Sequence, residues 1–385
     1  MTFELGRGTG PLRGVRVVEI AGIGPSPHAC MILADLGADI IRIERPGGQM
    51  LAGGSTDLLN RGRPSVALNL KDPAAVATVL DLVETADVLV EGMRPGVTER
   101  MGLGPDDALA RNPKLVYARM TGWGQTGPFA QVAGHDMNYI AITGTLHGLG
   151  QDKSKPMFPA NLVGDFGGGS TYLVMGILAA LLESRTSGEG QVVDAAIIDG
   201  TAHLNAMTAA FVASGNFNEQ RASNLLDGGA PYYDIYETSD GKHMSVGALE
   251  PQFYEIFVDL LGIRDQAPDR FDLAKYDELR TVIEKAFVSR TQAEWIEVFE
   301  GTDACVAGII PMTEAFNHPQ MKAREAFVEH EGITQPAPAP RFSRTEPTLG
   351  LPPAAKAGIH TREALTAWGV ANVDELLESG AAVQA

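Results

Sequence analysis

The chain has 385 residues, of which 44% are hydrophobic and 20% charged, and its formal net charge at pH 7 is −18. A chain of this length exceeds one small core and predicts two domains, or one large domain with an insertion. The acidic balance argues against a nucleic acid or an anionic membrane as the main partner, and the sequence shows neither an apolar run of transmembrane length nor a signal peptide.

In the first 120 residues, short apolar runs alternate with helix-compatible segments. The hydrophobic pattern there predicts two helices, at 28–36 and 73–85, and five strands, at 15–20, 39–44, 65–70, 87–90 and 114–120. Strand, helix and strand of this size form parallel, right-handed βαβ units, and strands this apolar belong in a sheet covered on both faces. The predicted fold class is therefore α/β, with a Rossmann-like parallel sheet.

The glycine-rich turn at 21–27 follows the first predicted strand, where a dinucleotide-binding fingerprint would lie. Gly22 and Gly24 are followed by Pro25 and Pro27, and no third glycine stands where G-x-G-x-x-G requires one. We reject NAD on that basis. The sequence also lacks a phosphate-binding P-loop motif and a lysine placed for pyridoxal chemistry.

A second glycine-rich stretch, residues 134–170, contains two groups that can move protons, His135 and Asp165. Three glycines and an apolar segment follow the aspartate, so we expect a loop that opens into a helix with Ser170 as its N-cap. Such a helix start offers free backbone N–H groups where negative charge develops. The alternative is that Asp165 only caps a turn and His135 only fills a loop.

The pattern of predicted helices and strands changes near residue 216. We expect helices at 171–184, 201–213, 251–261, 278–287, 292–299, 361–369 and 373–379, strands at 191–198, 228–237 and 243–249, and an extended proline-rich strap at 334–342. The predicted domains are a large Rossmann-like domain at 1–224, a small α+β domain at 225–330, and a strap with C-terminal helices at 331–385. Two cysteines, Cys30 and Cys305, are too few for a disulfide framework and are not spaced as a metal site, so we expect a cytoplasmic protein with Cys305 buried.

Several segments together are more specific than any single motif: LRGVRVVEI (12–20), LADLGAD (33–39), IERP (43–46), DVLVEGMRPG (87–96), YARMTGWGQTGP (117–128) and GDFGGG (164–169). On these segments the chain resembles the family III CoA-transferases, and within that superfamily it is most similar to the α-methylacyl-CoA racemases. The resemblance runs from about residue 11 to 344. It implies an interlocked homodimer whose active sites lie between the large domain of one chain and the small domain of the other.

The resemblance also implies roles for individual residues. His135 and Asp165 fall on the two active-site bases of the racemases, and Glu250 on the partner of the histidine. Residues implied to contact the CoA moiety are Arg45, Leu68, Asn69, Leu70, Lys71, Gly92, Met93, Arg94, Arg100, Gly134, Asp136, Met137, Asn138 and Tyr139. Asn161 and Tyr233 match residues at the acyl end.

These residues suit the inversion of a carbon α to a thioester, since that reaction needs an acid on one face and a base on the other. We therefore expect a racemase of 2-methyl-branched acyl-CoA thioesters, with no metal and no cofactor beyond the CoA moiety of the substrate. The main rival is a CoA-transferase that forms an anhydride on Asp165, and a third possibility is a non-catalytic protein that binds CoA thioesters.

Overall fold

The computed structural model describes residues 4–48 and 54–385, which divide into two compact units. The first unit holds the described residues up to Thr143 together with Pro159–Asn205 and Lys322–Ala385, and the second holds Gly144–Phe158 and Ala206–Met321. This division differs from the sequence-based boundaries, because residues 144–158 and 206–224 group with the second unit and residues 322–330 with the first. Arg221 explains part of that grouping, since its guanidinium donates to the carbonyl oxygens of His147 (2.7 Å) and Asp152 (3.1 Å).

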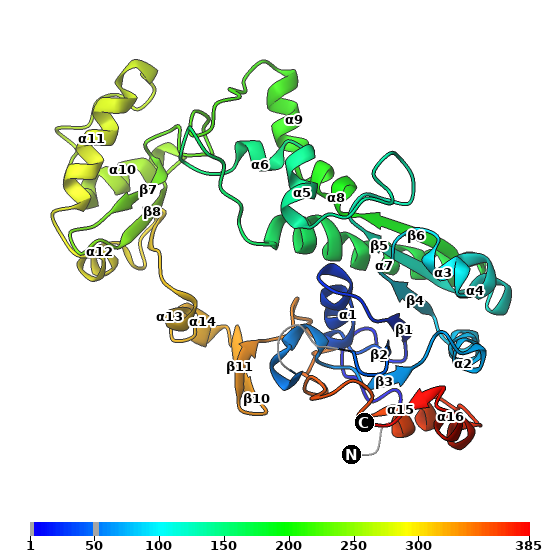
Figure 1. The fold of residues 1–385 in the computed structure, drawn as a ribbon. Helices are drawn as coiled ribbons and strands as arrows, with labels where there is room; N and C mark the ends of the chain where they lie inside the picture. Colours follow the sequence, from blue (N-terminus) through cyan, green and yellow to red (C-terminus); the bar gives the residue numbers. More distant parts are fainter. Residues whose placement is uncertain (1–3, 49–53) are drawn as a thin grey trace. The chain divides into compact units, whose positions relative to one another are not determined.

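The first unit is built on a seven-stranded sheet in the order β12-β3-β2-β1-β4-β5-β6 (Figure 1). All neighbouring strands are parallel except β12, which pairs antiparallel with β3 at the edge. The strands are β1 (Arg16–Ile20), β2 (Asp39–Glu44), β3 (Ser65–Leu68), β4 (Val88–Glu91), β5 (Val116–Thr121), β6 (Gln191–Ala196) and β12 (Ala382–Val383). The α/β fold and the strand positions expected in the first 120 residues are confirmed.

Alternate side chains of the strands enter two separate hydrophobic cores. Val18 and Ile20 of β1 pack with helices α2, α4, α15 and α16, whereas Val17 packs on the opposite face with α1 and α7. This period-two alternation, with apolar residues on both faces, is what a sheet covered by two helical layers requires. The helices of this unit are α1 (Pro25–Asp35), α2 (Pro73–Glu84), α3 (Val97–Arg100), α4 (Pro105–Arg111), α5 (Asp136–Ile142), α7 (Thr171–Ser187), α8 (Ile197–Leu204), α14 (Pro319–Ala323, at the unit boundary), α15 (Thr361–Ala367) and α16 (Val373–Ser379), with short 3-10 turns at Gly54–Thr56 and Leu58–Asn60.

Three local expectations were wrong. Helix α1 begins at Pro25, inside the stretch that we read as a turn, because proline suits the first turn of a helix. The helix expected at 201–213 is instead two helices, α8 and α9 (Ala206–Ala213). Part of the strap forms a hairpin of β10 (Phe327–His330) and β11 (Ile333–Pro336).

The segment Leu162–Ser187 forms one continuous helical run of 26 residues, and an 18-residue window within it has a mean hydropathy of 1.4. Contrary to our reading of the sequence, this run has the length and composition of a membrane span. A core helix of an α/β protein has the same properties, and 44% of that window is buried, with Leu173 and Ile177 fully enclosed against the sheet.

The second unit has its own core around a three-stranded antiparallel sheet in the order β7-β8-β9. The predicted hairpin is confirmed: Tyr233 of β7 pairs with Gly247 of β8, and Glu237 with His243. The elements of this unit are α6 (Thr145–Gly148), α9, β7 (Tyr233–Glu237), β8 (His243–Gly247), α10 (Pro251–Leu261), a 3-10 turn at Leu273–Lys275, α11 (Tyr276–Phe287), α12 (Gln292–Phe299), β9 (Val306–Gly308) and α13 (Met312–Ala315).

Candidate active site

The residues expected to contact CoA in the first unit gather after the carboxyl ends of parallel strands. Arg45 follows β2, the segment Leu68–Lys71 ends and follows β3, and Gly92–Arg94 follow β4. The strand order reverses at β1, which lies between β2 and β4. In open α/β sheets, ligands bind outside the carboxyl ends of the strands at such a reversal.

The cationic side chains at this edge are exposed. Arg45, Lys71, Arg94 and Arg100 all present their side chains to solvent. Leu68, in contrast, is fully buried in the core of the sheet, so only its backbone can meet a ligand. Asn69 and Leu70 are half-buried, as is Met93, whose N–H donates to Glu91 Oε2 at 2.7 Å.

His135 lies at the N-cap of helix α5, with an extended backbone and an exposed side chain. Its N–H donates to Asn138 Oδ1 at 3.1 Å, so Asn138 helps to start the helix. Met137 is exposed, whereas Tyr139 is buried edge-on against Trp123 and donates its hydroxyl hydrogen to Gly134 O. A short helix therefore aims His135 outward while fixing the residues behind it.

Asp165 lies in a π-helix, Leu162–Ser170, that continues directly into α7. The expected loop with Ser170 as N-cap is therefore wrong: Ser170 has helical backbone angles and no capping bond, and its hydroxyl donates to Phe166 O at 3.0 Å. The π-helix is rare in proteins and is frequently found at functional sites. Glycines at 164 and 167–169 allow it to pack closely against its neighbours, since a Cβ on Gly168 would lie 2.7 Å from Thr201 N.

Three groups surround Asp165: the buried carboxylate of Asp136, the side-chain amide of Asn161 and the backbone of the Gly24 turn. Asp165 N–H donates to Asp136 Oδ2 at 2.7 Å, and Asn161 Nδ2 donates to Asp165 Oδ2 at 3.3 Å. A Cβ on Gly24 would lie 3.2 Å from Asp165 Oδ2, and Gly24 has a φ of +67°, so glycine suits this position on both counts. Because its N–H is already directed at Asp136, Asp165 does not present the free N–H group expected of a helix start.

Burial raises the pKa of Asp165 above its usual range. The Asn161 hydrogen bond and the charge of His135 oppose this shift, while the charge of Asp136 adds to it. Asp136 is only 6% exposed, and within the described residues its Oδ1 atom has no hydrogen-bond partner. The first unit thus brings His135, Asp136, Asn161 and Asp165 together at one place.

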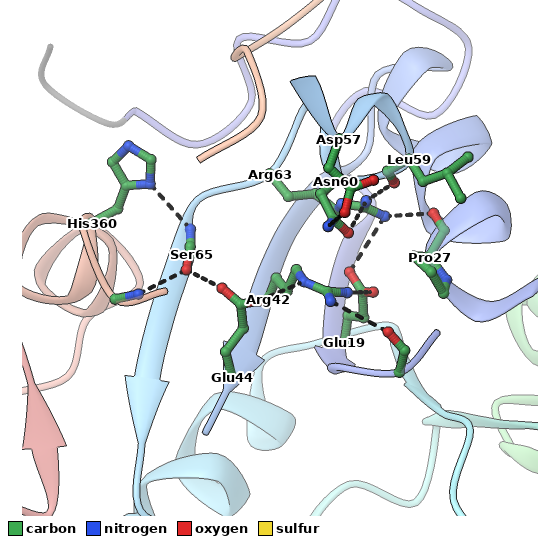
Figure 2. A network of polar contacts seen from close by, with 12 residues as sticks. Glu19, Pro27, Arg42, Glu44, Asp57, Leu59, Asn60, Arg63, Ser65 and His360 are labelled. Carbon is green, nitrogen blue, oxygen red and sulfur yellow. Dashed lines mark hydrogen bonds and ion pairs between the residues drawn. The ribbon is translucent and has the colours of Figure 1, made fainter. Parts of the chain in front are cut away.

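A buried ion network supports the same edge of the sheet (Figure 2). Arg42 forms ion pairs with Glu19 and with Glu44 (3.2 Å), and Arg63 lies 3.4 Å from the second oxygen of Glu19. Arg63 also donates to Pro27 O at 2.8 Å, at the start of α1. Because breaking a buried ion pair costs about 3–5 kcal/mol, this network fixes the turn that carries Gly24.

In the second unit, Glu250 and Tyr233 lie at one end of the three-stranded sheet. Glu250 is the exposed N-cap residue of α10. Gly247 pairs with Tyr233, and a Cβ on this glycine would lie 3.7 Å from the Tyr233 ring. Cys305 lies beside them: its carbonyl oxygen accepts from Gly247 N at 2.9 Å, and partial desolvation, together with the Glu250 charge, raises the pKa of its thiol. Contrary to expectation, Cys305 is exposed.

Sequence reasoning missed Gly24 as a neighbour of Asp165 and His28 as a neighbour of Phe166 and Ser170, because the turn was weighed only as a dinucleotide motif. It also missed the hydrogen bond between Asp136 and Asp165, which no local pattern encodes. Across residues 4–48 and 54–385 we find no group of three or more His, Cys, Asp or Glu side chains arranged to hold a metal ion.

The parallel sheet, the reversal of its strand order at β1 and the glycine-rich π-helix are shared with a known class of protein. Residues 12–361 match the model of CoA-transferase family III, and the chain belongs to that family. It is 41% identical to the α-methylacyl-CoA racemase of Mus musculus over 95% of both chains, and 38% identical to that of Homo sapiens over 96% of this chain and 98% of the human one. A CaiB/BaiF family protein from Brucella suis has a similar structure, with a TM-score of 0.79 and 26% identity over 91% of this chain and 97% of that one.

Proposed function

We propose that this protein is an α-methylacyl-CoA racemase, an isomerase that interconverts (R)- and (S)-2-methylacyl-CoA. The observation that carries the proposal is the half-buried Asp165, whose raised pKa equips it to hold a proton, placed within electrostatic reach of His135. The full-length similarity to two racemases supports it.

The reaction needs one proton shared between two groups. With neutral His135 and protonated Asp165, the histidine removes the α-proton and the aspartic acid delivers its own to the opposite face of the enolate. With imidazolium and carboxylate, the same steps run in reverse. Each correctly placed acid or base contributes about 10²–10⁴ in rate, and a pair coupled in this way titrates with macroscopic values that belong to the pair.

The sign of the Asp165 shift sets the acid side of the pH profile. Because its pKa is raised, Asp165 keeps its proton to a higher pH than an ordinary carboxyl. At low pH both groups are protonated and neither can act as the base. The value of kcat/KM should therefore rise with pH through a limb that lies above the usual aspartate range.

The substrate contacts follow the edge of the sheet. In this proposal Arg45, Lys71, Arg94 and Arg100 attract the phosphates of CoA, because exposed guanidinium and ammonium groups suit phosphate oxygens. The remaining CoA contacts come from Leu68, Asn69, Leu70, Gly92, Met93, Gly134, Asp136, Met137, Asn138 and Tyr139. Asn161 and Tyr233 serve the acyl end, and no metal or further cofactor takes part.

Glu250 is proposed to orient His135 and to stabilise its charged form, as the resemblance implies. The same resemblance supports an interlocked homodimer, and the low cysteine content favours a cytoplasmic location. Apolar side chains on three consecutive elements of the first unit are compatible with a subunit interface: Met175 is 52%, Leu182 71%, Val192 42% and Leu204 51% exposed. Light scattering that finds a monomer at working concentration would overturn the dimer.

The rival function is transfer of CoA between carboxylic acids through an anhydride on Asp165, which the family name favours. Proton NMR of (S)-2-methylacyl-CoA in D₂O, with and without a free carboxylic acid, separates the two. We expect the α-proton signal to disappear and the other epimer to form, independent of the acid. Passage of CoA to the added acid without α-exchange would establish the transferase instead.

A further inference from the structure

The π-helix that carries Asp165 contacts helix α1 through an aromatic pair. The ring of His28 stacks on Phe166, with centroids 4.2 Å apart and planes inclined by 25°. Phe166 is the residue directly after Asp165, so this contact lies within one residue of the proposed acid–base group.

A hydrogen bond closes the same contact. His28 Nδ1 lies 2.6 Å from the Oγ of Ser170, the last residue of the π-helix. We assign the Ser170 hydroxyl hydrogen to Phe166 O, 3.0 Å away, which makes Oγ the acceptor and His28 Nδ1 the donor. The His28 ring therefore touches both ends of the turn Phe166–Ser170, once through stacking and once through a hydrogen bond.

The His28 ring is itself firmly held and uncharged. Arg63, whose side chain is fully buried, donates to the carbonyl oxygen of the preceding residue, Pro27. Burial, together with the positive charges of Arg61 and Arg63, lowers the pKa of His28 to about 4. At neutral pH the ring has one N–H, which serves Ser170, and it brings no charge next to Asp165.

We propose that His28 is a positioning residue for Asp165: through Phe166 and Ser170 it holds the π-helix in the register that points the Asp165 carboxyl at the Gly24 turn. His28 does not exchange protons with the substrate. The inference rests on the proposed racemase function for its catalytic consequence, but its structural part stands on the contacts alone. We call the contacts of His28 with Phe166 and Ser170 the clamp. Since a displacement of about 1 Å can cost on the order of 10²-fold in rate, loss of the clamp should lower mainly kcat.

The catalytic test measures α-proton loss in D₂O from each enantiomer of 2-methylacyl-CoA. His28→Phe keeps the ring but removes the donor, and Ser170→Ala removes the acceptor. We expect either change to slow, by roughly 10–100-fold, exchange from the enantiomer that Asp165 deprotonates, with KM and exchange from the other enantiomer nearly unchanged. His135→Ala and Asp165→Ala identify which enantiomer each base serves.

Two controls separate positioning from general damage. His28→Asn, whose amide can replace the Nδ1 donor, should recover much of the rate. His330→Asn alters a histidine on β10 that is hydrogen-bonded to Gly350 O, and it should have no effect. The double variant H28F/S170A should be no slower than either single variant, because both remove one interaction. Equal slowing of both enantiomers without recovery in H28N would overturn the proposal.

A second readout does not depend on activity. Hydrogen–deuterium exchange followed by mass spectrometry should show faster backbone exchange in peptides that cover residues 161–171 of H28F, with the rest of the sheet unchanged. If wild-type protein exchanges no α-proton but H28F loosens this segment, the racemase function fails and the clamp survives. Unchanged backbone exchange in H28F would overturn the clamp, whatever the enzyme does.

Discussion

His135 and Asp165 are proposed to share one proton, yet the structure treats them differently. Asp165 is half-buried in a π-helix, and its backbone, carboxyl and neighbours are held by Asp136, Asn161 and the Gly24 turn. His135 is exposed at the start of a short helix, where its backbone N–H donates to Asn138 Oδ1. The difference teaches that the protonation of the aspartate is tuned within the first unit. For the histidine we propose that Glu250 supplies the orienting group.

The largest effect should come from removing either base. His135→Ala or Asp165→Ala should reduce racemisation by about 10²–10⁴-fold while each variant still exchanges the α-proton of one enantiomer. NMR in D₂O with each pure enantiomer measures this, and titration with acyl-CoA checks that binding is retained. Equal residual exchange from both enantiomers in Asp165→Ala would contradict the assignment of one base to each enantiomer.

Glu250→Gln tests whether the histidine side depends on the second unit. Loss of the carboxylate should slow racemisation by roughly 10²-fold, since an oriented and charge-stabilised imidazole loses its partner. Glu255→Gln is the matched control, because Glu255 is on the same helix, exposed, and paired with Arg264. A similar loss in both variants would assign the effect to helix α10 and not to the histidine.

Gly164→Ala tests the aspartate side. The added Cβ would lie 2.8 Å from Asp136 Cγ, so it should disturb the Asp136–Asp165 hydrogen bond and destabilise the fold by about 1–3 kcal/mol. Thermal unfolding and kcat measure the two effects. Gly148→Ala, where a Cβ meets nothing within 4 Å, should leave both unchanged.

The smallest effect concerns stability. Because the folded-state pKa of Asp165 is raised, its favourable contribution is present below the unfolded-state pKa and is lost as pH rises through the folded-state value. Asp165→Asn should therefore stabilise the protein at pH 8, by about 1 kcal/mol, and the gain should vanish near pH 4. His135→Asn should stay within about 0.5 kcal/mol at both pH values, as expected for an exposed position. A gain in Asp165→Asn that is equal at both pH values would contradict the buried-carboxyl account.

The sequence was sufficient for the elements whose signal is local. Strand Asp39–Glu44 carries three isoleucines between two acidic ends, and the hairpin around residues 239–242 has a recognisable turn. The π-helix could not be predicted, because its glycines look the same in a loop. The contact of Asp165 with Asp136, and of His28 with Ser170, joins residues far apart in the chain, and only the folded sheet brings them together.

Strand β12 also escaped prediction, since two residues, Ala382 and Val383, carry no periodic signal. Its pairing with β3 has a consequence for biosynthesis (Figure 1). During translation β3 emerges early, but the strand that covers its open edge is made only after the whole second unit. The nascent sheet therefore exposes an unpaired edge for most of synthesis, and it is in this interval that the chain is most vulnerable to pairing with a neighbour.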